Sequence, residues 1–228
     1  KNTAVGGAAL IFNTIGDHNT ATGYLALYAN TEGDYNTATG YEALKANTTG
    51  SQNTAVGVKA LATNTEGTEN TAVGYNAGYS VTIGSSNTFL GRAAGLLLTE
   101  GASNVIIGID AAEEMTTANS CVLIGGRAGF KNNGDDNVAV GFRALYNNTT
   151  GINNVAIGRD AFYTNTTGAY NVASGYKALY SNLDGERNVA HGTQALYTNT
   201  SGDDNVGIGH QALYNHTGGT TTAVGMKA

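Results

Sequence analysis

A phrase of about 17 residues recurs along the whole chain, and this repeat limits what the sequence can fold into. Each copy contains a glycine that follows a phrase of the Asn-Thr-Ala-Val type, and this anchor glycine occurs 14 times between Gly6 and Gly225. Successive anchors lie 17 residues apart eleven times and 16 residues apart twice. No break in composition interrupts the array, so we expect a single repeat array over residues 1–228 rather than several globular domains.

The copies differ in regularity. We expect regular coils over 1–73 and 135–228 and irregular coils over 74–134, where the Asn-Thr phrase is lost and three leucines follow one another at 96–98. The irregular coils are candidates for a receptor contact or a bend, although a change of cross-section between two shaft segments explains them better. The chain opens and closes inside a repeat phrase without a polar cap, so we expect an excerpt of a longer protein.

Comparing the copies with one another reveals three columns that behave as a core. Every copy has Ala three residues after the anchor, most have Ala two residues before it, and nine have Leu or Phe four residues after it. Where the residue two before the anchor is larger, as at Phe89, the residue four after the anchor is smaller, as at Gly95. Opposite volume changes indicate columns that touch in a close-packed interior. Gly78 is small without such a partner in its own copy.

The pattern favours strands over helices, because no 3.6-residue period survives and Asn-Thr pairs are poor helix formers. We expect two short strands per copy, Asn-Thr-Ala-Val-Gly and Ala-Leu-Tyr-x-Asn-Thr, joined by turns. A glycine ten residues after the anchor is expected to adopt φ > 0. The predicted fold class is therefore all-β, a parallel β-roll or β-solenoid of 14 coils with a 17-residue repeat.

Asparagine heads the repeat phrase in twelve copies. We interpret this column as a structural Asn ladder, in which each amide bonds its neighbours along the stack and the turn backbone, because a ligand site rarely needs twelve identical positions. Its members are Asn2, Asn19, Asn36, Asn53, Asn70, Asn87, Asn104, Asn137, Asn154, Asn171, Asn188 and Asn205. Cys121 takes this position in its copy and is expected to be a small packing residue.

Two further columns are candidates for an interface between copies of the chain. The position before the anchor is mostly Val, Ile or Leu, and the position five after it is rich in aromatic residues. An outward apolar stripe is normally covered by another subunit, so we expect self-association. If the tyrosines fold inward, a monomeric solenoid is the alternative. The candidate interface tyrosines are Tyr28, Tyr79, Tyr146, Tyr163, Tyr180, Tyr197 and Tyr214.

Composition excludes several classes of function. The chain has a net charge of −6, 12% charged residues and no basic patch, which argues against nucleic-acid binding. No apolar run is long enough for membrane insertion. The four histidines lie in different columns, and the calcium β-roll pattern is absent, so we expect no metal and no cofactor. The carboxylates single out no acid–base pair, and we expect no enzyme.

The phrases NNVAIGRDAF at 153–162 and NTAVGYNAG at 70–78 resemble the repeats of trimeric autotransporter adhesin heads and the NTAxGYxAL arrays of phage and prophage tail fibres. The resemblance covers all 14 copies. It implies a left-handed, homotrimeric β-roll that serves as a head or shaft in surface attachment, outside the cell or on a virion. The partners it implies are two further copies of the chain and a cell-surface glycan or protein receptor.

The main alternative is an ice-binding β-solenoid. Threonine fills most copies at the position eight after the anchor, and a regular threonine array on a solenoid is the kind of surface that ice-binding proteins display. The competing interpretation is that Thr suits a strand edge and caps the following turn. The column consists of Thr14, Thr31, Thr48, Thr65, Thr82, Thr99, Thr116, Thr149, Thr166, Thr200 and Thr217.

Overall fold

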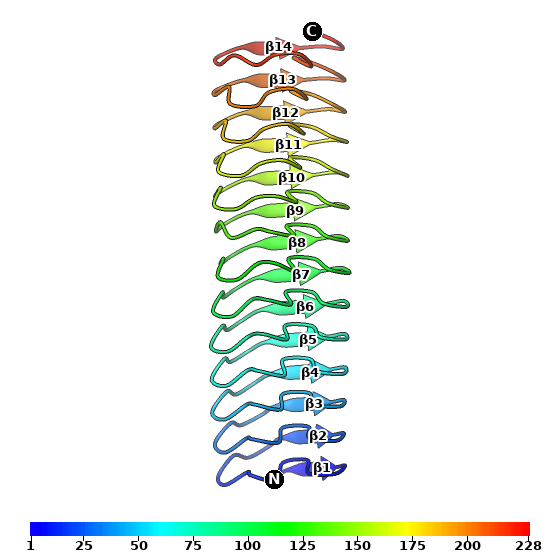
Figure 1. Cartoon of the computed structure of the whole chain (residues 1–228), viewed down its shortest axis with the longest axis vertical. Helices are drawn as coiled ribbons and strands as arrows, with labels where there is room; N and C mark the ends of the chain where they lie inside the picture. Colours follow the sequence, from blue (N-terminus) through cyan, green and yellow to red (C-terminus); the bar gives the residue numbers. More distant parts are fainter. The chain divides into compact units, whose positions relative to one another are not determined.

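The computed structural model describes all residues from 1 to 228. The chain is all-β and forms a β-solenoid with 14 parallel strands, one in each repeat (Figure 1). Each strand has three residues and ends immediately before an anchor glycine. The predicted β-solenoid with a repeat of about 17 residues is therefore confirmed. The structure contains no helix with the length and apolar character needed to cross a bilayer.

The chain divides into two compact units, Lys1–Thr117 and Ala118–Ala228, and the boundary falls inside the irregular stretch 74–134. The strands of the first unit are β1 (Thr3–Val5), β2 (Thr20–Thr22), β3 (Thr37–Thr39), β4 (Thr54–Val56), β5 (Thr71–Val73), β6 (Thr88–Leu90) and β7 (Val105–Ile107). Those of the second unit are β8 (Val122–Ile124), β9 (Val138–Val140), β10 (Val155–Ile157), β11 (Val172–Ser174), β12 (Val189–His191), β13 (Val206–Ile208) and β14 (Thr222–Val224).

Within each unit, neighbouring strands pair in parallel with equivalent residues opposite one another. In the first unit Thr20 pairs with Thr37 and Ala21 with Ala38, and in the second unit Val155 pairs with Val172. Because the register never slips, every position of the repeat forms a straight column of side chains along the unit. Figure 1 shows the strands of each unit stacked in chain order.

The expectation of a second strand in each coil is wrong. The residues after the anchor form successive turns, in which the second and fourth residues after the anchor lie in the left-handed region, for example Leu25 at φ 58° and Leu27 at φ 49°. A left-handed residue reverses the local direction of the backbone, so an extended strand cannot continue through it. The coils are still bonded to each other here, since the Leu27 N–H donates to the Ala43 carbonyl at 3.0 Å.

The predicted core columns do meet in the interior. Ala21, Ala26 and Leu27, one from each column, are fully buried. A Cβ on Gly95 would lie 2.6 Å from Cδ1 of Phe89, and one on Gly129 would lie 2.7 Å from Cδ1 of Leu123. The structure also explains Gly78, whose Cβ would lie 2.8 Å from Cδ2 of Phe89 in the next coil. The coupled changes of volume thus extend between coils as well as across them.

The glycine ten residues after the anchor has a different role from the predicted one. Its φ is not positive; a Cβ on Gly50 would lie 2.5 Å from the carbonyl oxygen of Gly67 in the next coil. Glycine is therefore required by the close approach of two backbones. Positive φ belongs to the anchor, as at Gly175 with φ +138°, where a Cβ would also lie 2.5 Å from the Gly192 carbonyl oxygen.

Candidate functional surfaces

The asparagines that head the repeat phrase lie inside the solenoid and link each coil to the next. The Asn36 N–H donates to Oδ1 of Asn19 at 2.8 Å, and its Nδ2 donates to the Gly50 carbonyl at 2.8 Å. The Asn53 N–H in turn donates to Oδ1 of Asn36 at 2.9 Å. The same bonds recur in both units and satisfy the amides with protein groups, so this column holds the backbone together and presents nothing to a ligand.

A second buried asparagine column lies seven residues after the anchor. Nδ2 of Asn47 donates to Oδ1 of Asn30 at 2.7 Å and to the Gly50 carbonyl at 2.8 Å. The Gly50 carbonyl therefore accepts one amide hydrogen bond from each asparagine column, the other coming from Asn36. In the coils that hold both asparagines, the two columns share one acceptor and so fix the position of the turn that follows. In the irregular coils, the second asparagine is replaced by Val81, Leu98 and Met115.

Most of the threonines eight residues after the anchor do not present free hydroxyls. Oγ1 of Thr31 donates to the Thr48 carbonyl at 3.1 Å, and Oγ1 of Thr48 donates to the Thr65 carbonyl at 3.0 Å. The second unit repeats the arrangement, with Thr149 donating to the Thr166 carbonyl at 2.8 Å. These hydroxyls are used to join coils, which agrees with a structural role and leaves this column poorly suited to bind ice.

Free threonine hydroxyls lie elsewhere, on the outward face of the strands in the first unit. The first and third residues of each strand point outward, so Thr20 and Thr22 in β2 and Thr37 and Thr39 in β3 form a paired array. None of these four hydroxyls is hydrogen-bonded within the protein. The phrase Thr-Ala-Thr at 20–22 and 37–39 is the sequence signal for this surface, and it differs from the threonine column eight residues after the anchor that the sequence favours as the ice-binding candidate.

The tyrosines five residues after the anchor are half-buried and stack on one another in the second unit. Tyr146, Tyr163, Tyr180, Tyr197 and Tyr214 continue a series that starts at Phe130, with ring centroids 4.9–5.3 Å apart and planes within 15° of parallel. We call these six rings the aromatic ladder. In the first unit, Tyr28 contacts Phe12 edge to face, and Tyr79 stacks on no other ring. The structure therefore brings together five of the seven predicted tyrosines.

Cationic side chains lie against the aromatic ladder. The guanidinium of Arg143 is 5.2 Å from the ring centre of Tyr163, and Nζ of Lys177 is 5.1 Å from that of Tyr180, distances at which a cation is attracted to an aromatic face. A side-chain hydrogen bond to Tyr176 raises the pKa of Lys177, and burial raises the pKa of Tyr180. Both groups are therefore held in their protonated forms at neutral pH.

Asp160 is the buried carboxylate of this region, with only 3% of its side chain exposed. Nε of Arg143 lies 2.8 Å from its Oδ1, and Nε of Arg159 lies 3.4 Å from its Oδ2. Two cations thus neutralise one buried anion, and the surface around them keeps a net positive charge.

Carboxylates in the turns before β3 and β13 cap backbone groups of the preceding coil. Oδ1 of Asp34 accepts the Asp17 N–H at 2.6 Å, and Oδ1 of Asp203 accepts the Glu186 N–H at 2.8 Å. Arg187 bonds both Asp204 and Glu186, and its hydrogen bond lowers the pKa of Asp204. No group of three or more His, Cys, Asp or Glu side chains is arranged to hold a metal ion.

Cys121 is buried in the asparagine column, as its position in the repeat predicts. Nδ2 of Asn132 lies 3.3 Å from its Sγ. Burial raises the pKa of the thiol to about 11, so the reactive thiolate is scarce at neutral pH.

Comparison of the chain with protein-family models, with curated proteins and with solved structures yields no match.

Proposed function

We propose that the chain is a structural and adhesive segment, a head or shaft, of a fibre that attaches a cell or virion to a surface. The observation that carries this proposal is the constant register of the coils within each unit. Side chains at one position of the repeat therefore form a straight column, as Thr37 and Thr54 do. Repeated presentation raises the avidity for a repetitive receptor without any strong single site. A cell-surface glycan or protein is the receptor that such a surface fits, and the role involves no catalysis.

The proposed assembly is a left-handed homotrimer, as in the adhesin heads and tail fibres that the repeats resemble. The outward face of the strands in the second unit supports self-association because it is mostly apolar, with Ser174, His191 and Thr222 as its polar members. Ile157 is 44% exposed, Val172 38% and Ile208 36%. Apolar side chains in register along a sheet face form a stripe of the kind that another subunit normally covers.

The solution mass of the 228-residue chain tests the assembly. Light scattering after size exclusion is expected to give about three times 23.2 kDa. The double variant Ile157→Asp, Ile208→Asp is expected to shift the mass toward the monomer, with circular dichroism showing that the solenoid is retained. A wild-type chain that stays monomeric over the whole concentration range would contradict the trimer.

Ice binding is the second candidate function, and the unbonded hydroxyls of Thr20, Thr22, Thr37 and Thr39 favour it. These threonines lie on a flat sheet face whose strands are about 4.8 Å apart, and each hydroxyl is available to order water. Thermal hysteresis of the purified protein is the test. Thr39→Lys is expected to abolish the hysteresis, whereas Thr49→Lys, an exposed position in the same coil but outside the strand face, is expected to preserve it.

A further inference from the structure

The charges of the second unit are sorted onto two opposite edges. One edge, formed by the turns that precede the strands, carries six carboxylates and one cation, Arg187, for a net charge of −5. We call it the turn edge, and its carboxylates are Asp135, Asp136, Asp184, Glu186, Asp203 and Asp204. Because the same repeat positions always fall on the same edge, the sorting follows directly from the register of the coils.

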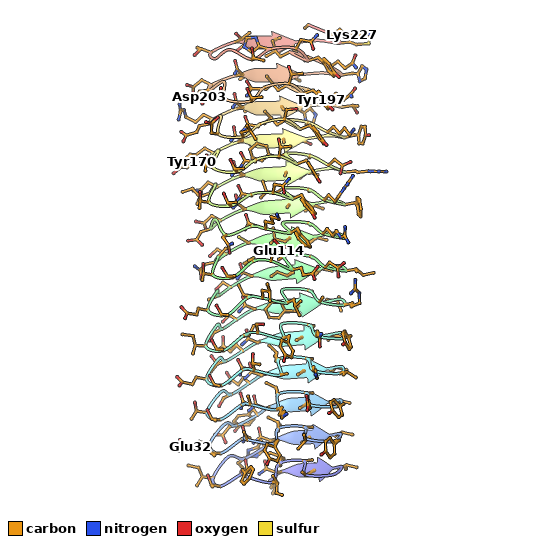
Figure 2. The ribbon with its side chains drawn as sticks, in the orientation of Figure 1. Glu32, Glu114, Tyr170, Tyr197, Asp203 and Lys227 are labelled. Atoms are coloured by element: carbon orange, nitrogen blue, oxygen red, sulfur yellow. The ribbon has the colours of Figure 1, made fainter.

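The other edge carries the aromatic ladder and the opposite charge. It holds one carboxylate, the buried Asp160, and six cations, for a net charge of +5. We call it the ring edge, and its cations are Arg127, Lys131, Arg143, Arg159, Lys177 and Lys227. Figure 2 shows Tyr170 and Asp203 on one side of the second unit and Tyr197 and Lys227 on the opposite side. Asp203 of the turn edge and Lys227 of the ring edge thus lie on opposite sides of the second unit.

Both edges also expose apolar side chains between their charges. Tyr170 is 56% exposed on the turn edge, with Leu183 at 45%. Phe142 and Tyr176 are 46% and 42% exposed on the ring edge. Aromatic and arginine side chains are the residues enriched in protein interfaces, and a polar rim around apolar contacts is their usual arrangement. Each edge thus combines exposed apolar side chains with charges mostly of one sign, and the two edges have opposite net charge.

We propose that the turn edge of the second unit docks on the ring edge of a second copy of this chain. The inference rests on the self-association proposed above and adds a charged contact surface to the apolar face of the strands. An interface between two different surfaces of the same protein is heterologous, so every copy offers one turn edge and one ring edge. Such contacts close into a ring when the rotation between copies allows it, which is compatible with a trimer.

The dependence of the wild-type mass on salt is the first test and needs no substitution. Charge pairing across the interface is screened as the Debye length falls from about 10 Å at 0.1 M salt to about 3 Å at 1 M. We expect the assembly to dissociate progressively over this range. An assembly that is unchanged or tighter at about 1 M salt would show that apolar contacts alone hold it, and would overturn this interface while leaving the proposed fibre assembly standing.

A pair of charge-reversal variants is the second test. The first variant, Asp136→Lys, Asp184→Lys, Asp204→Lys, changes the turn edge from −5 to about +1 and leaves the ring edge intact. The second, Arg159→Glu, Lys177→Glu, Lys227→Glu, changes the ring edge from +5 to about −1 and leaves the turn edge intact. Each variant alone then opposes like charges, and we expect its dissociation constant to rise about tenfold or more.

Mixing the two variants distinguishes lost docking from damaged folding. The intact ring edge of the first variant can still meet the intact turn edge of the second, so light scattering of the mixture is expected to show a 1:1 complex. Variants that associate alone as tightly as the wild type, or folded variants that remain monomeric when mixed, would overturn this interface. A wild-type chain that is monomeric even at low salt would overturn the proposed assembly as well.

Discussion

Phe89 fills the space that Gly95 in its own coil and Gly78 in the preceding coil leave open. Its ring atoms lie 2.6 Å and 2.8 Å from the positions that a Cβ would take at these two glycines. One large side chain therefore demands two small ones, and neither glycine can be understood from its own coil alone.

Truncation of this ring is expected to be costly. Phe89→Ala should lower the free energy of unfolding by about 3–5 kcal/mol, because it leaves a cavity beside both glycines. Gly95→Leu should also destabilise the wild type, since its side chain would overlap the ring. Combined with Phe89→Ala, however, Gly95→Leu should recover part of the loss, because the pair then matches Ala38 and Leu44 of a regular coil. Urea unfolding of the four proteins measures this coupling, and purely additive effects would contradict it.

The anchor glycines are expected to tolerate no side chain. In Gly175→Ala the new Cβ would lie 2.5 Å from the Gly192 carbonyl oxygen at a φ of +138°. The strained φ and the clash together should cost about 3 kcal/mol or more. Gly7→Ala is the matched control, because its Cβ would meet only a flexible tyrosine ring at 3.2 Å. Equal thermal stability of the two variants would contradict the assigned role of the anchor.

Removal of one internal amide should destabilise two coils at once. Asn36→Ala leaves the buried Asn53 N–H without its acceptor and the Gly50 carbonyl without one of its donors. The expected loss in unfolding free energy is about 2–4 kcal/mol. Gln52→Ala, at an exposed position of the same coil, should change it by less than about 0.5 kcal/mol. Chemical denaturation followed by circular dichroism provides the measurement.

We expect that the Arg143–Asp160 ion pair beside the aromatic ladder can be replaced as a pair, but that loss of one partner alone destabilises the fold. Arg143→Gln alone removes the closer of two cations from the buried Asp160 carboxylate, and should cost about 3 kcal/mol. The double variant Arg143→Gln, Asp160→Gln reproduces the pair Gln194 and Gln211, whose side chains bond at 3.0 Å elsewhere in the same unit. It should recover most of the loss. Thermal unfolding of the wild type and both variants measures the recovery. A double variant with a melting temperature as low as that of the single variant would contradict the expectation.

The thiol of Cys121 is expected to make stability depend on pH in the alkaline range. Its pKa is about 11 in the folded chain and near 9 when solvated, so the folded state binds the proton more tightly. The resulting contribution is fully present below pH 9 and is lost as pH rises through about 11. It amounts to about 2–3 kcal/mol. The difference in unfolding free energy between the wild type and Cys121→Ala is followed from pH 8 to 11. Because both proteins contain the same tyrosines, this difference reports the contribution of the Cys121 thiol alone.

The same burial predicts slow labelling of Cys121. A thiol reagent at pH 8 should react only when the chain unfolds, at a rate that rises with denaturant concentration. Rapid labelling of the native protein at pH 8 would show that the thiol is exposed.

The core could be predicted from sequence because its columns change together. Compensation between Phe89 and Gly95 is visible without coordinates, and so is the burial of Asn36, since both follow from comparing copies. The path of the turns could not be predicted. Leu27 adopts a left-handed conformation that costs about 1–2 kcal/mol locally, and the burial of its side chain together with its hydrogen bond to the next coil offsets this cost.

The functional surfaces were predicted less well than the core, for a related reason. Thr31 and Thr39 look equally polar in the sequence, yet the first bonds a neighbouring carbonyl and the second faces solvent. Which of them is free depends on the direction of each side chain relative to the next coil. The stacking of the tyrosines likewise depends on ring orientation, which the spacing of Tyr163 and Tyr180 alone does not define.

The asparagine bonds have a consequence for how the gene can change. Asn36 and Asn53 are joined across 17 residues, so an in-frame duplication of one whole repeat reproduces every such bond in the added coil. A shorter change must be absorbed in a turn, as in the 16-residue coil that loses one residue before Gly134 and still places Asn137 against the Gly151 carbonyl. Recombination between repeats should therefore alter the length of the protein in whole coils, and related sequences are expected to differ by integral numbers of coils.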